Sequence, residues 1–518
     1  MENEKTLKIL NPILKYFLTL ISMFRSNIRD YGMYIALFVI FLAFTILTGG
    51  GFLGASNFSN LLNQTAYVAV LAVGMTLVIV TRQIDLSVGY IGAFMGSFVV
   101  VAVEQGGFLA LIDFFQGWWP WMANLLSSNV VVIILVLLVA AVITTVVGII
   151  KGLLVAKVKV PSFVVTLAGM FIFKGLLYIR TNNRTIPTSN SFFNSIGIGY
   201  LPSLTVAGHT FDITVITLMI FILVIGVVFY LFFHKRSKNN KLGIENEKFS
   251  IAFTKLLFLS LVLGFIGYRL SSYKGISWLL LITVVVVVIY NFITTQTVLG
   301  RRIYAVGGNP DAAELSGISV EKTLVIIFVS MGILSLISGV MYASYVQNTS
   351  PNHGPFWELY AIAAAFIGGA SAEGGVGKVV NAVIGAIVLM SLKNGMALAA
   401  VDSNIEPIVL GSVLLISVIF DIYTRNVRSI DYVGIHYAKL FYKEDLKEAV
   451  KNCEEKLGEL KKVQEKQIAT PDLDIVDYEI AYINSKNELN NIKEKIKFAK
   501  ESDFDHLVNK AELAKKQN

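Results

Sequence analysis

One short stretch has the glycine and lysine spacing that could bind a phosphate, but it departs from a P-loop at two positions. In Gly374-Gly375-Val376-Gly377-Lys378 the first required glycine is replaced by Ala372, and the Ser or Thr that holds magnesium is replaced by Val379. The five histidines show no metal-ligand spacing, no Ser–His–acid arrangement is legible, and Cys453 is the single cysteine. The sequence therefore predicts a chain that is not an enzyme and holds no nucleotide, metal or other cofactor itself.

A second stretch, Thr81-Arg82-Gln83-Ile84-Asp85-Leu86-Ser87-Val88-Gly89, places ionisable groups between two apolar runs. Such groups near hydrocarbon cost about 2.5–3.5 kcal/mol each on insertion scales, so they usually serve a purpose. Asp85 and Ser87 can cap the following helix, and Arg82 can neutralise Asp85. Two interpretations stay open, a capped helix start at the membrane surface and a translocation pathway or gate. The candidate pathway or gating residues are Gln83, Asp85, Ser87, Gly89 and, in a later apolar run, Asn394.

A third polar stretch, Gly300–Ile318, separates two long apolar segments. Asn309 can cap a short helix whose first position is Pro310, where the missing N–H costs nothing. Gly317 can supply the left-handed residue that ends this helix. A short, well-capped helix between two membrane spans predicts a docking element rather than a simple connection.

The elements that must position these stretches are membrane helices. Hydrophobic residues make up 55% of the 518, charged residues 15%, and the mean hydropathy is +0.68, whereas soluble domains carry about 25% charged residues. The apolar runs are long enough to cross the membrane and lack the alternation of a β-barrel strand. We expect an all-α polytopic membrane protein with roughly ten to twelve crossings. The candidate spans are 33–49, 60–81, 88–103, 129–150, 161–179, 213–233, 251–268, 277–295, 323–345, 359–372, 378–400 and 405–423, of which 88–103 and 359–372 are short or glycine-rich and can be broken or re-entrant.

The net charge of +8 follows from basic residues in short loops and in the tail, which indicates membrane topology and not nucleic-acid binding. We expect both termini and the loop 300–322 in the cytoplasm. The basic residues expected on that side are Lys151, Lys157, Lys159, Lys235, Arg236, Lys238, Lys241, Arg301 and Arg302.

Three domains follow from these patterns: a basic interfacial leader (1–30), a transmembrane region (31–425) and a charged extension (430–518). The extension repeats apolar residues at spacings of four and three in two segments, with Thr470-Pro471-Asp472 between them. This pattern predicts a cytoplasmic antiparallel coiled-coil hairpin. A solvated, partly disordered tail is the alternative.

The polar stretches together resemble a known family. Ile84–Gly89, Ala305–Ile318 and the block Ala363–Ser371, with its following glycines and Lys393-Asn394-Gly395, are similar to the bacterial ribose/xylose/galactose-type ABC transporter permeases. The extra pair of apolar runs around 213–268, with the basic linker 234–248, is similar to the longer xylose or multiple-monosaccharide permeases. The resemblance covers about residues 30–425. It departs at Arg82-Gln83, where the family commonly has small residues, and in the tail beyond about 430.

The resemblance implies the permease subunit of an ATP-driven monosaccharide importer in the bacterial cell membrane. A separate ATPase would bind ATP and magnesium, an extracytoplasmic binding protein would deliver the sugar, and a second permease copy would complete a homodimer. The coupling contact with the ATPase would fall on Gly308, Asn309, Pro310, Ala312, Ala313, Leu315, Ser316, Gly317 and Ile318.

Other classes remain possible at this level. A branched-chain amino-acid ABC permease would need a site for a zwitterion. An ion-coupled secondary transporter would need buried coupling acids, for which Asp85 is the main candidate, and would not need the 300–318 loop. A membrane enzyme such as a glycan polymerase would need paired acids or arginines in large outer loops.

Overall fold

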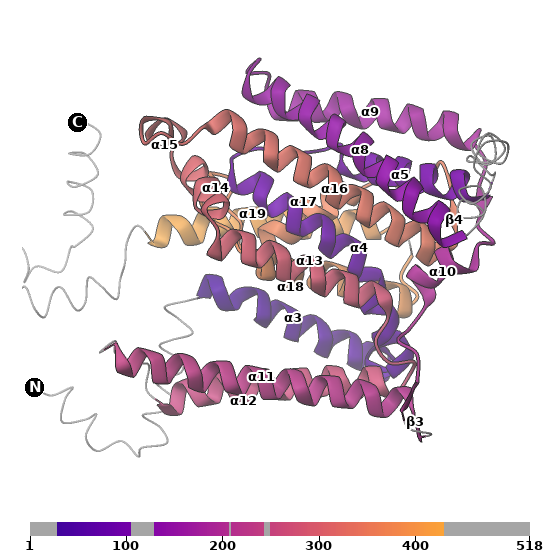
Figure 1. Ribbon diagram of the computed structural model, residues 1–518. Coiled ribbons are helices and arrows are strands. Elements are labelled where there is room, and N and C mark those ends of the chain that lie inside the picture. Colours follow the sequence, from indigo (N-terminus) through magenta and orange to yellow (C-terminus); the bar gives the residue numbers. More distant parts are fainter. Residues whose placement is uncertain (1–27, 105–128, 207–208, 243–248, 403, 429–518) are drawn as a thin grey trace, which may run out of the picture. The chain divides into compact units, whose positions relative to one another are not determined.

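The computed structural model describes residues 28–104, 129–206, 209–242, 249–402 and 404–428. Nearly all of these residues are helical or lie in short connections between helices (Figure 1). The longer helices are α3 (Ile28–Leu47), α4 (Ala55–Val80), α5 (Val88–Glu104), α8 (Asn129–Ala156), α9 (Ser162–Thr181), α11 (Ile213–Lys241), α12 (Phe249–Ser271), α13 (Trp278–Gln296), α16 (Val320–Val346), α18 (Val379–Leu398) and α19 (Glu406–Arg428). The shorter helices are η1 (Gly51–Leu53), α10 (Ser191–Ile198), α14 (Val298–Gly308), α15 (Pro310–Leu315) and α17 (Trp357–Ile367).

Helices α4 and α16 form the centre of the bundle. Almost every residue of α4 from Ala66 to Val80 is buried, because α13, α16, α17 and α18 all pack against it. Helix α16 also packs against α5 and α8. A helix that is apolar all round and buried on all sides is typical of the core of a membrane bundle.

Small residues allow α5 and α16 to approach closely. A side chain at Gly339 would collide with the Gly92 carbonyl oxygen, and one at Gly96 would lie 2.6 Å from the Gly339 carbonyl oxygen. Close backbone approach through small residues is how membrane helices associate when water supplies no hydrophobic driving force.

Helix α17 spans only part of the bundle, as the glycine-rich sequence of this segment predicts. Its 11 residues measure about 16 Å, roughly half of the 30 Å of hydrocarbon. The connection that precedes α17 enters the bundle, since Gly354 contacts Gly89 and Ala93 of α5. Helix α17 therefore begins inside the bundle and not at its surface.

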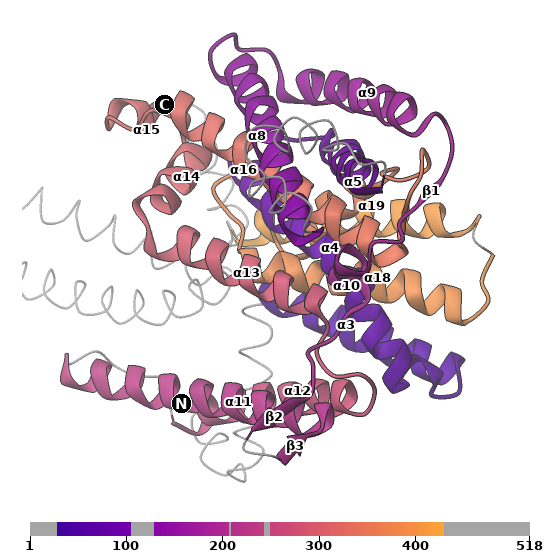
Figure 2. The same ribbon diagram turned by 45° about the vertical axis from the view of Figure 1, so that its right-hand side comes forward.

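The bundle has two ends that differ in content. Helices α14 and α15 lie at one end, which we call the α15 end, and α10 and β4 (Asn348–Thr349) lie at the other, the β4 end (Figure 1). Figure 2 shows α14 and α15 next to each other in a second view. Strand β4 pairs antiparallel with β1 (Ile186–Pro187), and β2 (Leu204–Val206) pairs antiparallel with β3 (His209–Phe211). The β1–β4 pair ties the segment after α9 to the segment after α16.

The all-α membrane class predicted from the sequence is confirmed. Among the described residues, eight helices are long and apolar enough to cross a membrane, and shorter apolar helices occur at 32–47, 88–104, 357–367 and 406–419. The number of crossings stays a prediction. The leader, the tryptophan-containing segment 105–128 and the coiled-coil hairpin predicted for 430–518 lie outside the described residues.

Candidate functional site

Helix α15 begins in the way that the sequence predicts. The Asn309 side-chain oxygen accepts a hydrogen bond of 3.1 Å from the Ala312 amide, and Pro310 is the first helical residue. Asp311 lies in the first turn, where the helix dipole stabilises a negative charge. The start of this short helix is therefore satisfied by its own sequence.

The end of α15 is closed by a left-handed glycine. Gly317 has φ of 80°, and the Ile318 amide donates to the Ala313 carbonyl at 3.0 Å, as in a Schellman motif. Leu315 is 91% exposed, whereas Ala313 is only 4% exposed and faces the interior of this chain. Of the apolar residues expected to contact a partner, Ala313 is thus covered and Leu315 is almost fully exposed.

Three backbone segments meet directly behind α15. Gly307, at the end of α14, lies against Val80 at the end of α4, so that a side chain at 307 would collide with the Val80 carbonyl oxygen. The Gly375 amide donates to the same Val80 carbonyl at 2.8 Å. The Tyr304 hydroxyl donates to the Gly377 carbonyl at 2.6 Å. We call this contact of α4, α14 and the segment before α18 the glycine junction.

The partner of Arg82 differs from the predicted one. Its guanidinium does not neutralise Asp85; its Nε donates to the Gly307 carbonyl at 2.8 Å, and its second nitrogen donates to the Gly308 carbonyl. These carbonyls end α14, where a positive charge is favoured by the helix dipole. Arg82 therefore joins the end of α4 to the residues that lead into α15.

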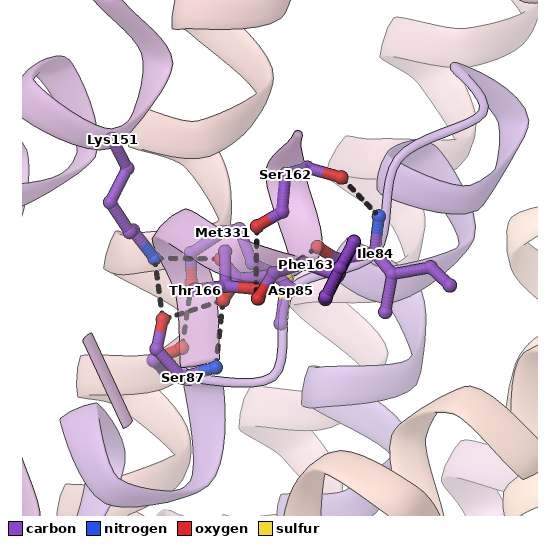
Figure 3. Close-up of polar contacts among 9 residues, drawn as sticks. Ile84, Asp85, Ser87, Lys151, Ser162, Phe163, Thr166 and Met331 are labelled. Carbon is purple, nitrogen blue, oxygen red and sulfur yellow. Dashed lines mark hydrogen bonds and ion pairs between the residues drawn. The ribbon is translucent and has the colours of Figure 1, made fainter. Parts of the chain in front are cut away.

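Asp85 pairs instead with Lys151 of α8 (Figure 3). The Lys151 ammonium lies 2.6 Å from one Asp85 carboxylate oxygen and donates to the Ser87 hydroxyl at 3.0 Å. The other Asp85 oxygen accepts from the Ser87 hydroxyl at 2.5 Å and from the Ser87 amide at 2.9 Å. Asp85 and Ser87 are fully buried and Lys151 is 4% exposed. The network is an ion pair buried within the bundle.

The same loop is also tied to α9. The Ile84 amide donates to the Ser162 hydroxyl at 3.3 Å, and the Thr166 hydroxyl lies 3.3 Å from the Ile84 carbonyl (Figure 3). The segment between α4 and α5 is therefore held by α8 and α9 on one side and, through Arg82, by α14 on the other.

The remaining candidate pathway residues are not all brought together. Gly89 follows the Asp85 network directly and packs against Gly354, while Gln83 is half-buried and its amide lies 3.2 Å from the Thr81 carbonyl. Asn394 lies elsewhere, on α18, where its amide pairs with that of Asn57 at 2.9 and 3.2 Å. The predicted set thus separates into two places in the bundle.

Lys151 is the residue of this site whose place was predicted wrongly. The sequence predicts it in a basic loop, but it lies inside α8, whose apolar run continues to Ala156. The length of that run was a usable signal, because a lysine with apolar residues on both sides is inside a span, where it needs a partner. Among the described residues, no three His, Cys, Asp or Glu side chains gather in a way that could hold a metal ion.

These features define a polytopic membrane protein with an exposed, capped helix joined to its core by backbone contacts. The sequence profile of the family described as "Branched-chain amino acid transport system / permease component" matches residues 57–204 and 195–418. The chain belongs to this family of transport permeases.

Individual relatives agree with this assignment. The chain is 39% identical to the xylose transport system permease protein XylH of Haemophilus influenzae, over 76% of this chain and 96% of that protein. It is 37% identical to XylH of Escherichia coli K12, over 77% and 93%, and 31% identical to the ribose import permease protein RbsC of Bacillus subtilis, over 77% and 94%. No solved structure matches the chain.

Proposed function

We propose that this chain is the membrane-spanning subunit of an ATP-driven, binding-protein-dependent importer of monosaccharides, with a pentose as the first candidate substrate. The names of its relatives support a sugar: those at 37–39% identity are named for xylose and those at 28–31% for ribose. The family description mentions branched-chain amino acids, but none of these relatives is named for them. A sugar is therefore favoured over a zwitterionic amino acid.

A single observation carries the proposed ATPase contact, namely the exposure of Leu315. An apolar side chain that is 91% exposed on a short, fully capped helix gains nothing within this chain and stabilises the complex when a partner covers it. The proposed partner is a separate ATPase, which binds ATP and magnesium and receives α15 in a surface cleft. Asn309 and Gly317 hold α15 in the form that docks.

Charge supports a cytoplasmic location for the α15 end. Basic residues are more frequent in cytoplasmic loops than in outer ones. Helix α14 exposes Arg301 and Arg302, and the end of α11 carries basic residues in its last turn. The β4 end then faces outward, where the sugar-binding protein docks, and both termini lie in the cytoplasm of a bacterial cell. A second copy of the chain completes a homodimer.

The proposed mechanism is alternating access. When the ATPase closes, α15 moves, and the glycine junction passes this movement to α4 and to the start of α18. Backbone-to-backbone contact transmits displacement with little loss because packed interfaces are not continuously deformable. The opposite ends of these helices then open or close the path for the sugar.

The test is reconstitution of the chain in liposomes with its ATPase and its binding protein. We expect xylose or ribose uptake that needs ATP. The variant Leu315→Glu should weaken co-purification of the ATPase about tenfold or more, since a charge replaces an apolar anchor. The matched control is Leu242→Glu at the end of α11, another exposed leucine at the same end of the bundle, which should leave the complex intact.

Two outcomes would contradict the proposal. Sugar uptake without ATP, driven by an ion gradient, would indicate an ion-coupled secondary transporter. Equal ATPase recovery with Leu315→Glu and with the wild type would show that α15 is not the contact.

A further inference from the structure

Aromatic side chains from α4, α16 and α17 meet inside the bundle. The rings of Tyr67 and Tyr342 lie 4.9 Å apart, and the Trp357 ring lies 5.1 Å from Tyr67 and 4.6 Å from Tyr342. His353 contacts Tyr342 at 5.0 Å. We call these four residues the aromatic cluster. Tyr67 is the thirteenth residue of α4, about 18 Å along a helix of about 39 Å, so the cluster is near the middle of the membrane.

The polar ends of these aromatic residues are unpaired. Among the described residues, the hydroxyls of Tyr67 and Tyr342 and the indole N–H of Trp357 have no hydrogen-bond partner. None of these three groups is completely enclosed by the surrounding protein. Other tyrosines of the bundle are paired, as with Tyr290 and Ser330 at 2.6 Å. Leaving a buried donor unsatisfied costs about 1–3 kcal/mol, so a ligand that accepts hydrogen bonds from these donors gains binding free energy.

Amide side chains adjoin the cluster. Gln64 lies one helical turn from Tyr67, on the same side of α4, and its oxygen is 3.5 Å from the Asn394 amide nitrogen. Asn394 exchanges two hydrogen bonds with Asn57, so this group offers donors and acceptors together. Gln64 and Asn57 are half-buried, whereas α4 is buried throughout from Thr65 to Val80.

The cluster also has an ion pair at its edge. The Lys393 ammonium lies 2.8 Å from Glu406 and 3.4 Å from the Tyr360 hydroxyl, and Tyr360 is one turn from Trp357. The two charges of this pair neutralise each other, so the pair itself adds no net charge beside the cluster.

We propose that the aromatic cluster, together with Gln64 and Asn394, is the site through which the sugar ring passes. A monosaccharide has apolar C–H faces that pack on aromatic rings and hydroxyls that donate and accept, and both needs are met here. The site lies where α17 starts inside the bundle, and interrupted helices near the bilayer midplane are a common place for transported ligands. This proposal rests on the monosaccharide import proposed above.

The test compares single variants in the reconstituted importer. Tyr67→Phe removes one hydroxyl and keeps the ring, and Gln64→Met keeps the volume and removes the amide. Each should lower sugar uptake about three- to tenfold, the value of one hydrogen bond, while ATPase activity stimulated by the binding protein persists. Each should also change the ratio of uptake rates between the sugar and its monodeoxy analogues, which a purely structural role would not do.

Tyr290→Phe is the matched control, because it removes a hydroxyl that is bonded inside the protein and away from the cluster. It should leave the ratio among analogues unchanged. If the wild type imports sugar and both cluster variants keep its rate and its ratios, the transit site is refuted and the proposed function stands. If the wild type imports no monosaccharide at all, the proposed function itself fails.

A chemical test uses the single cysteine of the chain. In a Cys453→Ser background, Gln64→Cys should react with a small water-soluble thiol reagent, and the sugar should slow this reaction several-fold. Failure of the reagent to reach position 64, or labelling at the same rate with and without sugar, would overturn the proposed site even if Tyr67→Phe does not assemble.

Discussion

Two regions of this bundle differ in how their polar groups are paired, namely the α15 end and the aromatic cluster. At the α15 end, the glycine junction and the Asp85–Lys151 pair are closed: backbone lies on backbone, and the charged atoms have partners within the chain. In the aromatic cluster, large side chains meet with their hydroxyls and indole N–H unpaired. In the proposed function, coupling and substrate contact are therefore carried by separate residues.

The strongest test of this contrast is at Gly307. Gly307→Ala places a methyl group against the Val80 carbonyl, and overpacking of this kind costs about 1–3 kcal/mol or more because backbone cannot move aside as a side chain can. We expect uptake to be nearly abolished, measured in liposomes with the ATPase present.

The control for this substitution is Gly175→Ala on α9, where an added Cβ meets nothing within 4 Å. It should insert and transport as the wild type does. Normal transport by Gly307→Ala would show that the junction is looser than the contacts indicate.

The second test compares the loss of a lysine from the buried ion pair with the loss of a lysine at the surface. Lys151→Met leaves the Asp85 carboxylate buried without its partner, which typically costs about 3–5 kcal/mol. We expect a clear fall in the midpoint of thermal unfolding in detergent, whereas Lys322→Met, at an exposed position of α16, should change it little.

The double variant Asp85→Asn with Lys151→Met should be less destabilised than the sum of the two single variants, since neither charge remains. Strict additivity would mean that the two side chains do not act as a pair.

The smallest expected effect is at Arg82. Arg82→Gln removes the positive charge from the end of α14 and weakens the contact with the Gly307 and Gly308 carbonyls, a loss of about 1–2 kcal/mol. The residue is exposed, so folding should be little affected. We expect a few-fold fall in sugar molecules moved per ATP hydrolysed, and Arg82→Lys should restore part of it. An unchanged ratio would exclude Arg82 from coupling.

Features that depend on neighbouring residues were predicted well from the sequence. The cap by Asn309 and the left-handed Gly317 involve partners within five residues, and both are confirmed. The helical membrane class is confirmed as well, because an apolar run of about 20 residues is recognisable without its partners. The predicted pair of Arg82 and Asp85 was wrong, although the two are only three residues apart. Arg82 has φ of 62°, and its guanidinium bonds to the Gly307 and Gly308 carbonyls instead.

The sequence by itself therefore determined the membrane class, the short capped helix and the resemblance to sugar permeases. Only the tertiary structure decided which distant groups meet: Asp85 with Lys151 over 66 residues, Arg82 with Gly307 over 225, and Asn57 with Asn394 over 337. The physical reason is that caps are local hydrogen bonds, whereas the sequence of a helix that is apolar on every side does not show which helices pack against it. That packing depends on how small residues and buried polar groups fit together between helices.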